Sequence, residues 1–393
     1  MKAFVILGPG EAGVGDVPEP VAGVGEVVVA VERAGVCGTD FEFFSGAMHY
    51  LSNGQARYPM RIGHEWCGTV VETGEGVHPA WTGRRVVGDT MLGCGHCRRC
   101  RGGHQHVCAA RQEVGIRGGR AGALAERMSV PVTALHELPP EVDATAGALV
   151  EPGGNALRAA EAALGLDAEK LWAAPGAAGS VLRGVVAPGG GAPWAGRAAP
   201  RPGGTAAGET AGANGRTAAE AADPVADGPR VVVYGPGTIG LLTAMFLRAA
   251  GAEAHLVGVT RESVDFARRL GFPAAATPPE APVDAVVDAT GDPAMPAAAV
   301  ELVEPAGRVV YIGLAGVPSS VDMRQLVLKD ITAVGILSAS PGLEAAIGTY
   351  ASGDVDPRPL VAGTVGLAGV AEVFAGWRPE GAGPKVLVDP RRL

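Results

Sequence analysis

The sequence predicts an α/β protein built from two parts, an antiparallel barrel-like domain and a doubly wound parallel sheet. Up to about residue 130, short segments with a period near two are separated by Gly and Pro, which is typical of antiparallel strands. From Arg230 onward, β-rich strands alternate with helical segments, the pattern of a parallel sheet covered by helices. The length of 393 residues agrees with two cores rather than one.

The predicted elements follow in chain order. In the first part we expect five strands, at residues 3–7, 26–37, 68–74, 84–89 and 123–130. In the second part we expect strands at 230–234, 254–259, 284–290 and 307–314, with helices at 241–251, 261–271 and near 295–303. The tail holds further strands and a helical stretch around 343–350, and it could complete the barrel of the first part.

Residues 173–229 interrupt this order. The segment consists mostly of Ala, Gly, Pro and Thr, with almost no large apolar residues and no period. Such a composition cannot bury enough surface to offset the entropy of ordering, so we predict a flexible insertion. Its start, KLWAAPGAAG at Lys170–Gly179, resembles VVVYGPGTIG at Val231–Gly240, and only the second has a β-rich strand before it and a long helix after it.

Charge and hydropathy exclude several classes of protein. The formal net charge is −9 and the basic residues form no stripes, which argues against binding to nucleic acid. The start MKAFVIL is too short for the apolar region of a signal peptide, and no apolar run could cross a bilayer. We therefore expect a cytoplasmic protein without a membrane partner, in a compartment where clustered cysteines more often bind metal than form disulfides.

Four of the six cysteines lie in CGHCRRCRGGHQHVC, with the spacing C-x2-C-x2-C-x7-C. Tetrahedral zinc takes four thiolates, whereas an iron–sulfur cluster would need an electron-transfer context that nothing else here provides. Four thiolates leave no open position, so the predicted zinc stabilises its lobe and performs no chemistry. His96, His104 and His106 could replace a cysteine but read as exposed loop residues. The predicted ligands are Cys94, Cys97, Cys100 and Cys108.

A second metal site is indicated by three separate motifs. AGVCGTDFE places Cys37 at a strand end, GHEWCG places His64 beside Glu65, and LVEPGGNA places Glu151 before a proline. Each motif is weak alone, because a lone Cys or His is usually a packed residue. Three protein ligands would leave a fourth position for a water or substrate oxygen, which is the arrangement of a catalytic zinc.

With these motifs the chain resembles the zinc-dependent medium-chain alcohol dehydrogenases, in particular the polyol, threonine and glucose dehydrogenase branches. The resemblance implies a GroES-like barrel at 1–165 with 339–393 returning to it, and a Rossmann domain at 166–338. It also implies that Cys37, His64 and Glu151 bind the catalytic zinc, and that the four-cysteine lobe binds a structural zinc. A homodimer or homotetramer is expected from the resemblance alone.

Further residues take roles from the same comparison. Thr39 is expected to accept the substrate proton and pass it to a cofactor ribose, although its alternative is a residue chosen for β-propensity. Asp40 is expected to orient His64 through the second ring nitrogen, as carboxylates often do at zinc sites. Glu65 could lie behind the zinc. Glu42 stands where many relatives carry His, which favours a polar, sugar-like substrate unless it is simply a surface residue.

A dinucleotide site is predicted at Gly235, Gly237 and Gly240, with Thr238 and Ile239 in the same G-x-G-x-x-G turn. The motif stands between a strand and a helix, where glycines let the backbone approach a pyrophosphate. At the end of the next strand no carboxylate meets the ribose 2′ position, and Thr260 with Arg261 could hold a phosphate. This favours NADP over NAD, unless Thr260 only caps the next helix and Arg261 faces solvent.

The sequence thus predicts a zinc- and NAD(P)-dependent oxidoreductase that acts on a secondary alcohol, a polyol or a sugar-like small molecule, or on the matching ketone. One alternative keeps the fold and takes an aminocyclitol-like biosynthetic intermediate as substrate. Another alternative, of a different class, is a non-catalytic zinc- and nucleotide-binding scaffold or sensor, with the insertion at 173–229 as its interaction arm.

Overall fold

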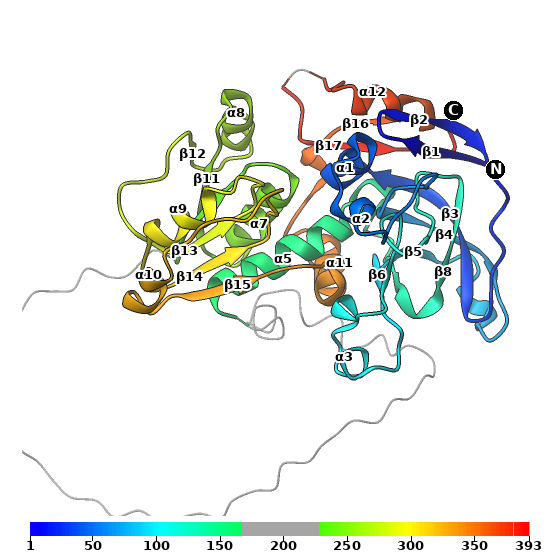
Figure 1. Cartoon of the computed structure of the whole chain (residues 1–393), viewed down its shortest axis with the longest axis horizontal. Coiled ribbons are helices and arrows are strands. Elements are labelled where there is room, and N and C mark those ends of the chain that lie inside the picture. The colour runs from blue at the N-terminus through cyan, green and yellow to red at the C-terminus, as the bar shows by residue number, and fades with distance from the viewer. Residues whose placement is uncertain (167–227, 380, 393) are drawn as a thin grey trace, which may run out of the picture.

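A computed structural model describes residues 1–166, 228–379 and 381–392 of the chain. Two sheets lie side by side, each at the centre of one part of the molecule (Figure 1). Apart from its last two residues, the predicted insertion at 173–229 lies outside the described residues, and so does the repeated motif at its start.

The first part is a seven-stranded sheet in the order β16-β17-β3-β4-β5-β9, with β8 also paired to β3. All its pairs are antiparallel except β16 with β17, so strands from near both ends of the chain meet in one sheet. Its strands, together with those of the two-stranded sheets β1-β2 and β6-β7 beside it, are β1 (Lys2–Gly8), β2 (Glu11–Asp16), β3 (Glu26–Gly35), β4 (Glu65–Thr73), β5 (Arg85–Gly88), β6 (Met91–Leu92), β7 (Gln112–Glu113), β8 (Arg127–Pro131), β9 (Leu135–Glu137), β16 (Val361–Val365) and β17 (Lys385–Val388).

Runs of consecutive buried residues along β3 and β4 contribute much of the core of the barrel. In β3 and β4 the inward residues are buried, and Trp66 is the largest side chain that is almost fully enclosed there. The loops of the barrel contain short helices, namely α1 (Gly38–Ser45), α2 (His49–Ser52), α3 (Arg98–Arg101), α4 (Ala144–Gly147) and α12 (Val370–Phe374).

The second part is a six-stranded sheet in the order β12-β11-β10-β13-β14-β15, and every pair in it is parallel. Because the strands are buried on both faces, they read as nearly continuous Val and Ala runs. Its elements are β10 (Arg230–Tyr234), α7 (Thr238–Ala249), β11 (Glu253–Val257), α8 (Arg261–Arg269), β12 (Ala274–Ala275), β13 (Val283–Asp288), α9 (Met295–Leu302), β14 (Val303–Tyr311), α10 (Met323–Leu328) and β15 (Thr332–Gly335).

Two helices join the parts, α5 (Val150–Leu164) and α11 (Leu343–Ser352). One hydrophobic cluster contains Cys67 and Val87 of the barrel, most of the buried face of α5, and Leu241 of α7. The core is therefore continuous across α5, which lies between the two sheets in Figure 1.

Sequence patterns did not predict α5, because its first turn contains Pro152 followed by two glycines. Proline is tolerated there because the first-turn N–H groups have no partner within a helix. Gly153 is required by packing, since a Cβ at this position would lie 2.2 Å from the hydroxyl oxygen of Tyr350 on α11.

The predicted strands of both parts and the three predicted helices of the second part are present, and the helical stretch near 343–350 is α11. The predicted fold class, a GroES-like barrel with a Rossmann domain, is confirmed. Within the described residues, no helix is both long and apolar enough to span a bilayer.

Candidate metal and cofactor site

Cys37, His64 and Glu65 meet at the barrel edge, with one ligand atom of each within 4.8 Å of the other two. Cys37 follows β3 and precedes α1, whereas His64 directly precedes β4 and Glu65 is its first residue. The register pairs Gly35 of β3 with Glu65 of β4, so the two motifs are neighbours across one antiparallel pair. Strand pairing thus brings together residues that are 27 positions apart in the sequence.

Asp40 contacts the segments that carry Cys37 and His64 and fixes their positions. It is fully buried, and its carboxylate accepts hydrogen bonds from the backbone N–H of Cys37 (2.9 Å) and of Gly63 (3.3 Å). The Oδ1 atom lies 3.6 Å from Nδ1 of His64, so this ring nitrogen faces the carboxylate. Burial favours the neutral ring, but Asp40 and Cys37 outweigh it and raise the pKa of His64 well above its usual value.

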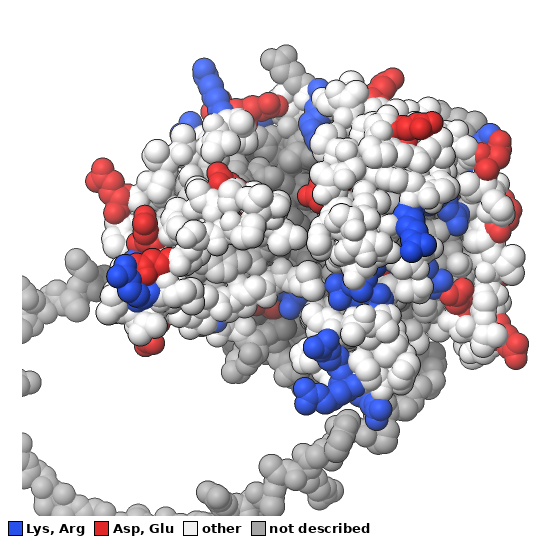
Figure 2. Space-filling view, viewed as in Figure 1, with Lys and Arg blue, Asp and Glu red and all other residues white. Residues whose placement is uncertain are grey.

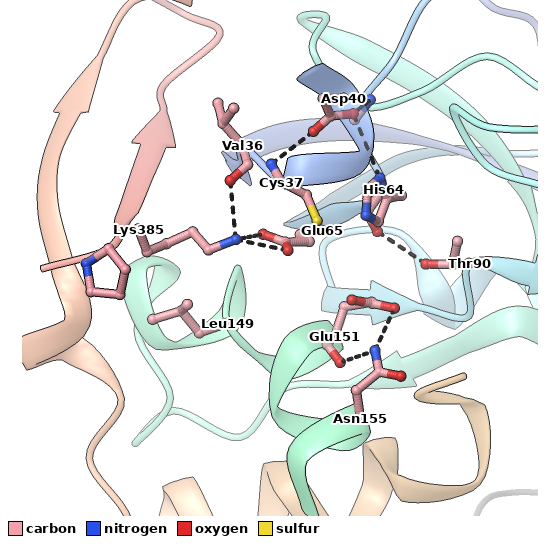
Figure 3. A network of polar contacts seen from close by, with 12 residues as sticks. Val36, Cys37, Asp40, His64, Glu65, Thr90, Leu149, Glu151, Asn155 and Lys385 are labelled. Atoms are coloured by element: carbon pink, nitrogen blue, oxygen red, sulfur yellow. Dashed lines mark hydrogen bonds and ion pairs between the residues drawn. The ribbon is translucent and has the colours of Figure 1, made fainter. Parts of the chain in front are cut away.

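Glu151 lies opposite this group, near the start of α5 (Figure 3). Its carboxylate points toward Cys37 and His64, and Asn155, one turn later, donates a hydrogen bond of 3.1 Å to it. Burial raises the pKa of Glu151 to about 7; the nearby His64 opposes the shift and Glu65 adds to it. Among the described residues, the group whose ligand atoms lie within 4.8 Å of one another contains Glu65 and not Glu151, and Glu151 faces this group from α5.

Lys385, the first residue of β17, is a member of this site that the sequence did not reveal. Its ammonium group donates to both oxygens of Glu65, at 2.8 and 2.6 Å, and to the carbonyl of Val36. Both side chains of the pair are almost completely buried, at 3% and 2% exposed. The pair directs the carboxylate of Glu65 toward Lys385, and only a contact across 320 residues could have shown it.

Thr39 and Glu42 occupy different environments on α1. Thr39 is half-buried, and within the described part of the chain its hydroxyl makes no hydrogen bond, so it is free to bond a ligand. Glu42 is exposed, although partial desolvation raises the pKa of its carboxyl group.

The four-cysteine lobe fits a tetrahedral metal. The Sγ atom of Cys97 lies 3.5 Å from the Sγ atom of Cys100 and 3.8 Å from that of Cys108. The Sγ atom of Cys94 lies 4.0 Å from that of Cys100. Four thiolates at the usual Zn–S distance of about 2.3 Å would be about 3.8 Å apart. Backbone N–H donors, foremost that of Cys94, lower the pKa of Cys108 to about 6 and thereby favour the thiolate that zinc binds.

The glycine turn after β10 is shaped for a close backbone approach. Gly235 has a φ of +88°, which L side chains rarely adopt, and a Cβ on Gly240 would lie 2.0 Å from the carbonyl oxygen of Gly235. A Cβ on Gly237 would meet nothing within 4 Å and would project into open space. Thr238 and Ile239 open α7 directly after this turn, so the helix N-terminus faces the space that Gly237 leaves.

A cavity of about 690 Å³ begins at this turn, and the surface is hollowed between the two parts (Figure 2). Thr260 lines it, with its hydroxyl engaged in capping α8. The Arg261 side chain is 95% exposed and lies 3.4 Å from Asp265, outside the lining. Another arginine, Arg378, reaches the cavity from the loop before β17, and Pro384 of the same loop lines it too.

The loop before β17 links the two sites. Residues 382–384 border the cavity, and the next residue, Lys385, holds Glu65 beside Cys37 and His64. One loop thus contributes both to the lining of the cavity and to the contact that holds Glu65.

Comparison with known families agrees with this geometry. Residues 23–140 match the Alcohol dehydrogenase GroES-like domain, and residues 238–351 match the Zinc-binding dehydrogenase domain. The chain belongs to the zinc-dependent medium-chain alcohol dehydrogenase family. It is accordingly an oxidoreductase that uses zinc and a nicotinamide cofactor on a small molecule.

Related sequences in this family include L-threonine 3-dehydrogenase of Streptomyces avermitilis, 28% identical over 95% of this chain and 94% of the relative. The enzyme of the same name from Legionella pneumophila strain Corby is 36% identical, over 37% of this chain and 42% of its own length.

Similar solved structures share the fold. One is 2R,3R-butanediol dehydrogenase from Bacillus subtilis, with a TM-score of 0.73 and 23% identity over 99% of both chains. Another is a putative zinc-binding dehydrogenase from Sinorhizobium meliloti bound to NADP, with a TM-score of 0.74, 23% identity and the same coverage.

Proposed function

We propose that this dehydrogenase oxidises a secondary alcohol of a polyol, sugar-like or hydroxy amino acid substrate, or reduces the matching ketone, at Cys37, His64 and Glu151. The observation that carries the proposal is that Cys37 and His64 lie in one cluster of possible metal ligands, which the carboxylate of Glu151 faces. The chain segment directly before Lys385, which binds Glu65 of this cluster, also lines the cavity that starts at the glycine turn. Relatives named as threonine and butanediol dehydrogenases agree with a secondary alcohol.

The donor set suits a zinc with an open position. Cys37 offers a thiolate, His64 a ring nitrogen oriented by Asp40, and Glu151 a carboxylate, which is the chemistry of a catalytic rather than a structural site. With the four-cysteine lobe, we infer two zinc ions per chain. The catalytic zinc would polarise the substrate hydroxyl, and the nicotinamide would exchange hydride with the substrate carbon.

The protein's own residues then orient the substrate and move its proton. Thr39, whose hydroxyl has no partner within the described chain, would take the hydroxyl proton of the substrate and pass it on toward the cofactor ribose. Lys385 keeps the second carboxylate, Glu65, paired and turned toward the protein. Because Lys385 and Glu65 are buried, water is excluded from around them, and this strengthens the electrostatic contacts of the site.

We further propose that the cofactor is NADP rather than NAD. Two features support it: Gly258 directly follows β11, where NAD-specific sites usually place an acid, and Arg378 lines the cavity. Arg261, on the cavity's rim but outside its lining, could turn toward a 2′-phosphate, since its contact with Asp265 is an exposed pair of small energy. Glu262 also lines the cavity, where its carboxylate would favour a ribose hydroxyl, and binding titrations with NADP⁺ and NAD⁺ decide between the two cofactors.

The test combines metal content with turnover. We expect the wild-type protein to carry two zinc ions per chain and to oxidise a member of a panel of L-threonine, butanediols, polyols and sugars. Cys37→Ser should lose one zinc and at least 1,000-fold in kcat/KM while it keeps its fold, an expectation of roughly 4 kcal/mol or more of lost transition-state stabilisation. Cys100→Ser is the matched control, and it should mainly lower the melting temperature.

Contrary results would be clear. One zinc per chain, lost in Cys100→Ser and kept in Cys37→Ser, would overturn the catalytic zinc and favour a scaffold. Turnover of an aminocyclitol, tested beside the panel, with no turnover of any panel member would replace the proposed substrate class by a biosynthetic one, with the same residues in the same roles.

We also propose a homodimer formed through the edge of the parallel sheet, in a cytoplasmic protein. β15 is the terminal strand in the sheet order, and four large apolar side chains near it are strongly exposed: Leu314, Met323, Val327 and Leu328. An uncovered strand edge beside exposed apolar side chains is a common docking surface. A mass of twice the chain by light scattering would support the dimer, and a monomer at micromolar concentration would overturn it.

A further inference from the structure

A second cavity, of about 340 Å³, lies on the barrel and shares no lining residue with the cavity at the glycine turn. It is enclosed by β1, by the segment after β2, and by the loops at 56–61 and 116–121. Four arginines line it, and the other lining residues are apolar or glycine. We call it the arginine cavity, after Arg57, Arg61, Arg117 and Arg120.

The positive charge of this cavity is only partly compensated. Arg120 forms an ion pair of 2.5 Å with Glu26, and Arg117 lies 3.8 Å from Glu113, which also pairs with Arg111. Arg57 and Arg61 have no carboxylate partner within the described part of the chain. On the face seen in Figure 2, Lys and Arg side chains gather over the barrel and over the four-cysteine lobe that contains α3. Most of the acidic side chains on this face lie nearer the edge of the molecule.

Two donors of these arginines are buried without an acceptor. Among the described residues, Nη1 of Arg61 and Nε of Arg120 are inaccessible and make no hydrogen bond. A buried charged donor without an acceptor destabilises the folded state. Burial also lowers the pKa of Arg61, so the protonated guanidinium is held at a cost. An oxyanion in the cavity would balance the positive charge and could accept from the guanidinium N–H groups that face it.

We propose that the arginine cavity binds a small phosphate dianion, either inorganic phosphate or the phosphate group of a phosphorylated metabolite. Guanidinium groups offer paired N–H donors that match two phosphate oxygens, and several arginines around one volume are typical of phosphate sites. The volume exceeds what free phosphate needs and lies within the range of small-ligand pockets.

Binding here would tie two loops together close to the metal-ligand group. The carbonyl of Arg61 already accepts a hydrogen bond of 2.9 Å from the N–H of Gly122, so the loops at 56–61 and 116–121 are in contact. His64 follows Arg61 by three residues, and the N–H of Gly63 between them donates to Asp40. The bound anion therefore stabilises the segment that delivers His64.

The experiment is a calorimetric titration of phosphate into the zinc-loaded protein at constant ionic strength. NAD⁺ is present at saturation, so that the cavity at the glycine turn is filled by a ligand without a phosphate monoester. We expect saturable binding by the wild type, and at least 10-fold weaker binding by Arg61→Gln and by the double variant Arg57→Gln/Arg61→Gln. The matched control is Arg84→Gln, which removes the same charge from an exposed pair with Glu137 on the same barrel.

Each outcome has a meaning. Absence of binding, unchanged binding in Arg61→Gln, or an equal loss in Arg84→Gln would overturn the proposal. Melting temperatures without phosphate verify that the variants fold, and phosphate should raise that of the wild type but not that of Arg61→Gln. If glucose 6-phosphate binds more tightly than phosphate while glucose does not bind, the site takes phosphorylated metabolites; equal affinities indicate phosphate itself.

Discussion

Lys385 and Glu65 form a buried ion pair, and removing either partner is expected to lower the stability of the fold. Replacing Lys385 by Met would leave the carboxylate of Glu65 enclosed at 2% exposure without a counter-charge. We expect a loss of about 3–5 kcal/mol in the free energy of unfolding, the usual effect of removing one partner of a buried pair. Urea unfolding of the zinc-loaded protein measures it.

The control for this residue is Lys385→Arg, which keeps the charge and should retain most of the stability. The double variant Lys385→Met/Glu65→Gln should recover part of the loss, because the remaining side chain is then neutral. Equal stabilities of Lys385→Met and the wild type would show that water reaches Glu65 and that the pair is not sealed.

Arg378 is predicted to recognise the 2′-phosphate of the cofactor. Arg378→Ala should raise KM for NADP⁺ about 10-fold or more, the effect of losing a charge-assisted hydrogen bond of about 1.5–3 kcal/mol. KM for NAD⁺ should change little. Arg261→Ala is the companion variant, and a larger selective effect there would mean that its exposed side chain moves to the phosphate. Equal changes for both cofactors in both variants would contradict the NADP preference.

At the scale of elements, α5 positions Glu151 by close contact with α11. Gly153→Ala would place a Cβ against the Tyr350 hydroxyl, and we expect it to destabilise the protein by about 1–3 kcal/mol, as overpacking does. Displacement of the helix start should also lower kcat, because Glu151 stands two residues earlier. Thermal unfolding and steady-state kinetics measure the two effects.

The contact between Gly153 and Tyr350 also provides the control for this prediction. In a Tyr350→Phe background the hydroxyl is absent, so Gly153→Ala should cost less stability than it does in the wild type. Tyr350→Phe itself removes only the hydrogen bond to the carbonyl of Leu149. Purely additive effects of the two substitutions would mean that the helices do not meet at this point.

Local patterns predicted the elements whose periodicity is strong. Short Val-rich segments bounded by Gly revealed β3 and β4, and the apolar–charged spacing of RESVDFARRLG revealed α8. The pattern failed for α5, since Pro152 and two glycines are unfavourable in a helix by propensity and are accepted only through end effects and packing. The motifs around Cys37, His64 and the glycine turn could be found because they are contiguous, whereas Lys385 and Arg378 reach their sites through long-range folding.

At the scale of the whole molecule, His136 connects the barrel with α11. Its ring lies 3.9 Å from Asp89 and 3.5 Å from Glu344 of that helix. Burial alone would lower the pKa of His136, but Asp89 and Glu344 outweigh it and raise the pKa to about 9. The folded state thus binds this proton more tightly than the unfolded chain does.

The sign of the pH effect follows from linkage. The stabilisation is fully present below about pH 6.5, the unfolded pKa of histidine, and is lost as the pH rises through about 9. We expect about 1–2 kcal/mol, less than the full shift implies because Glu344 is largely exposed. His136→Gln should flatten the stability profile between pH 6 and 10, and an unchanged profile would exclude the contact as its source.

The position of Lys385 also sets an order of events during synthesis. Its partner Glu65 leaves the ribosome 320 residues earlier, which at typical elongation rates corresponds to roughly 15–60 s. During that interval the barrel lacks β16 and β17, and the carboxylate beside Cys37 and His64 has no counter-ion. The ion pair that encloses Glu65 beside these metal ligands can therefore form only after the nucleotide domain has been synthesised. The site that acts on substrate is completed later than the domain that binds the cofactor.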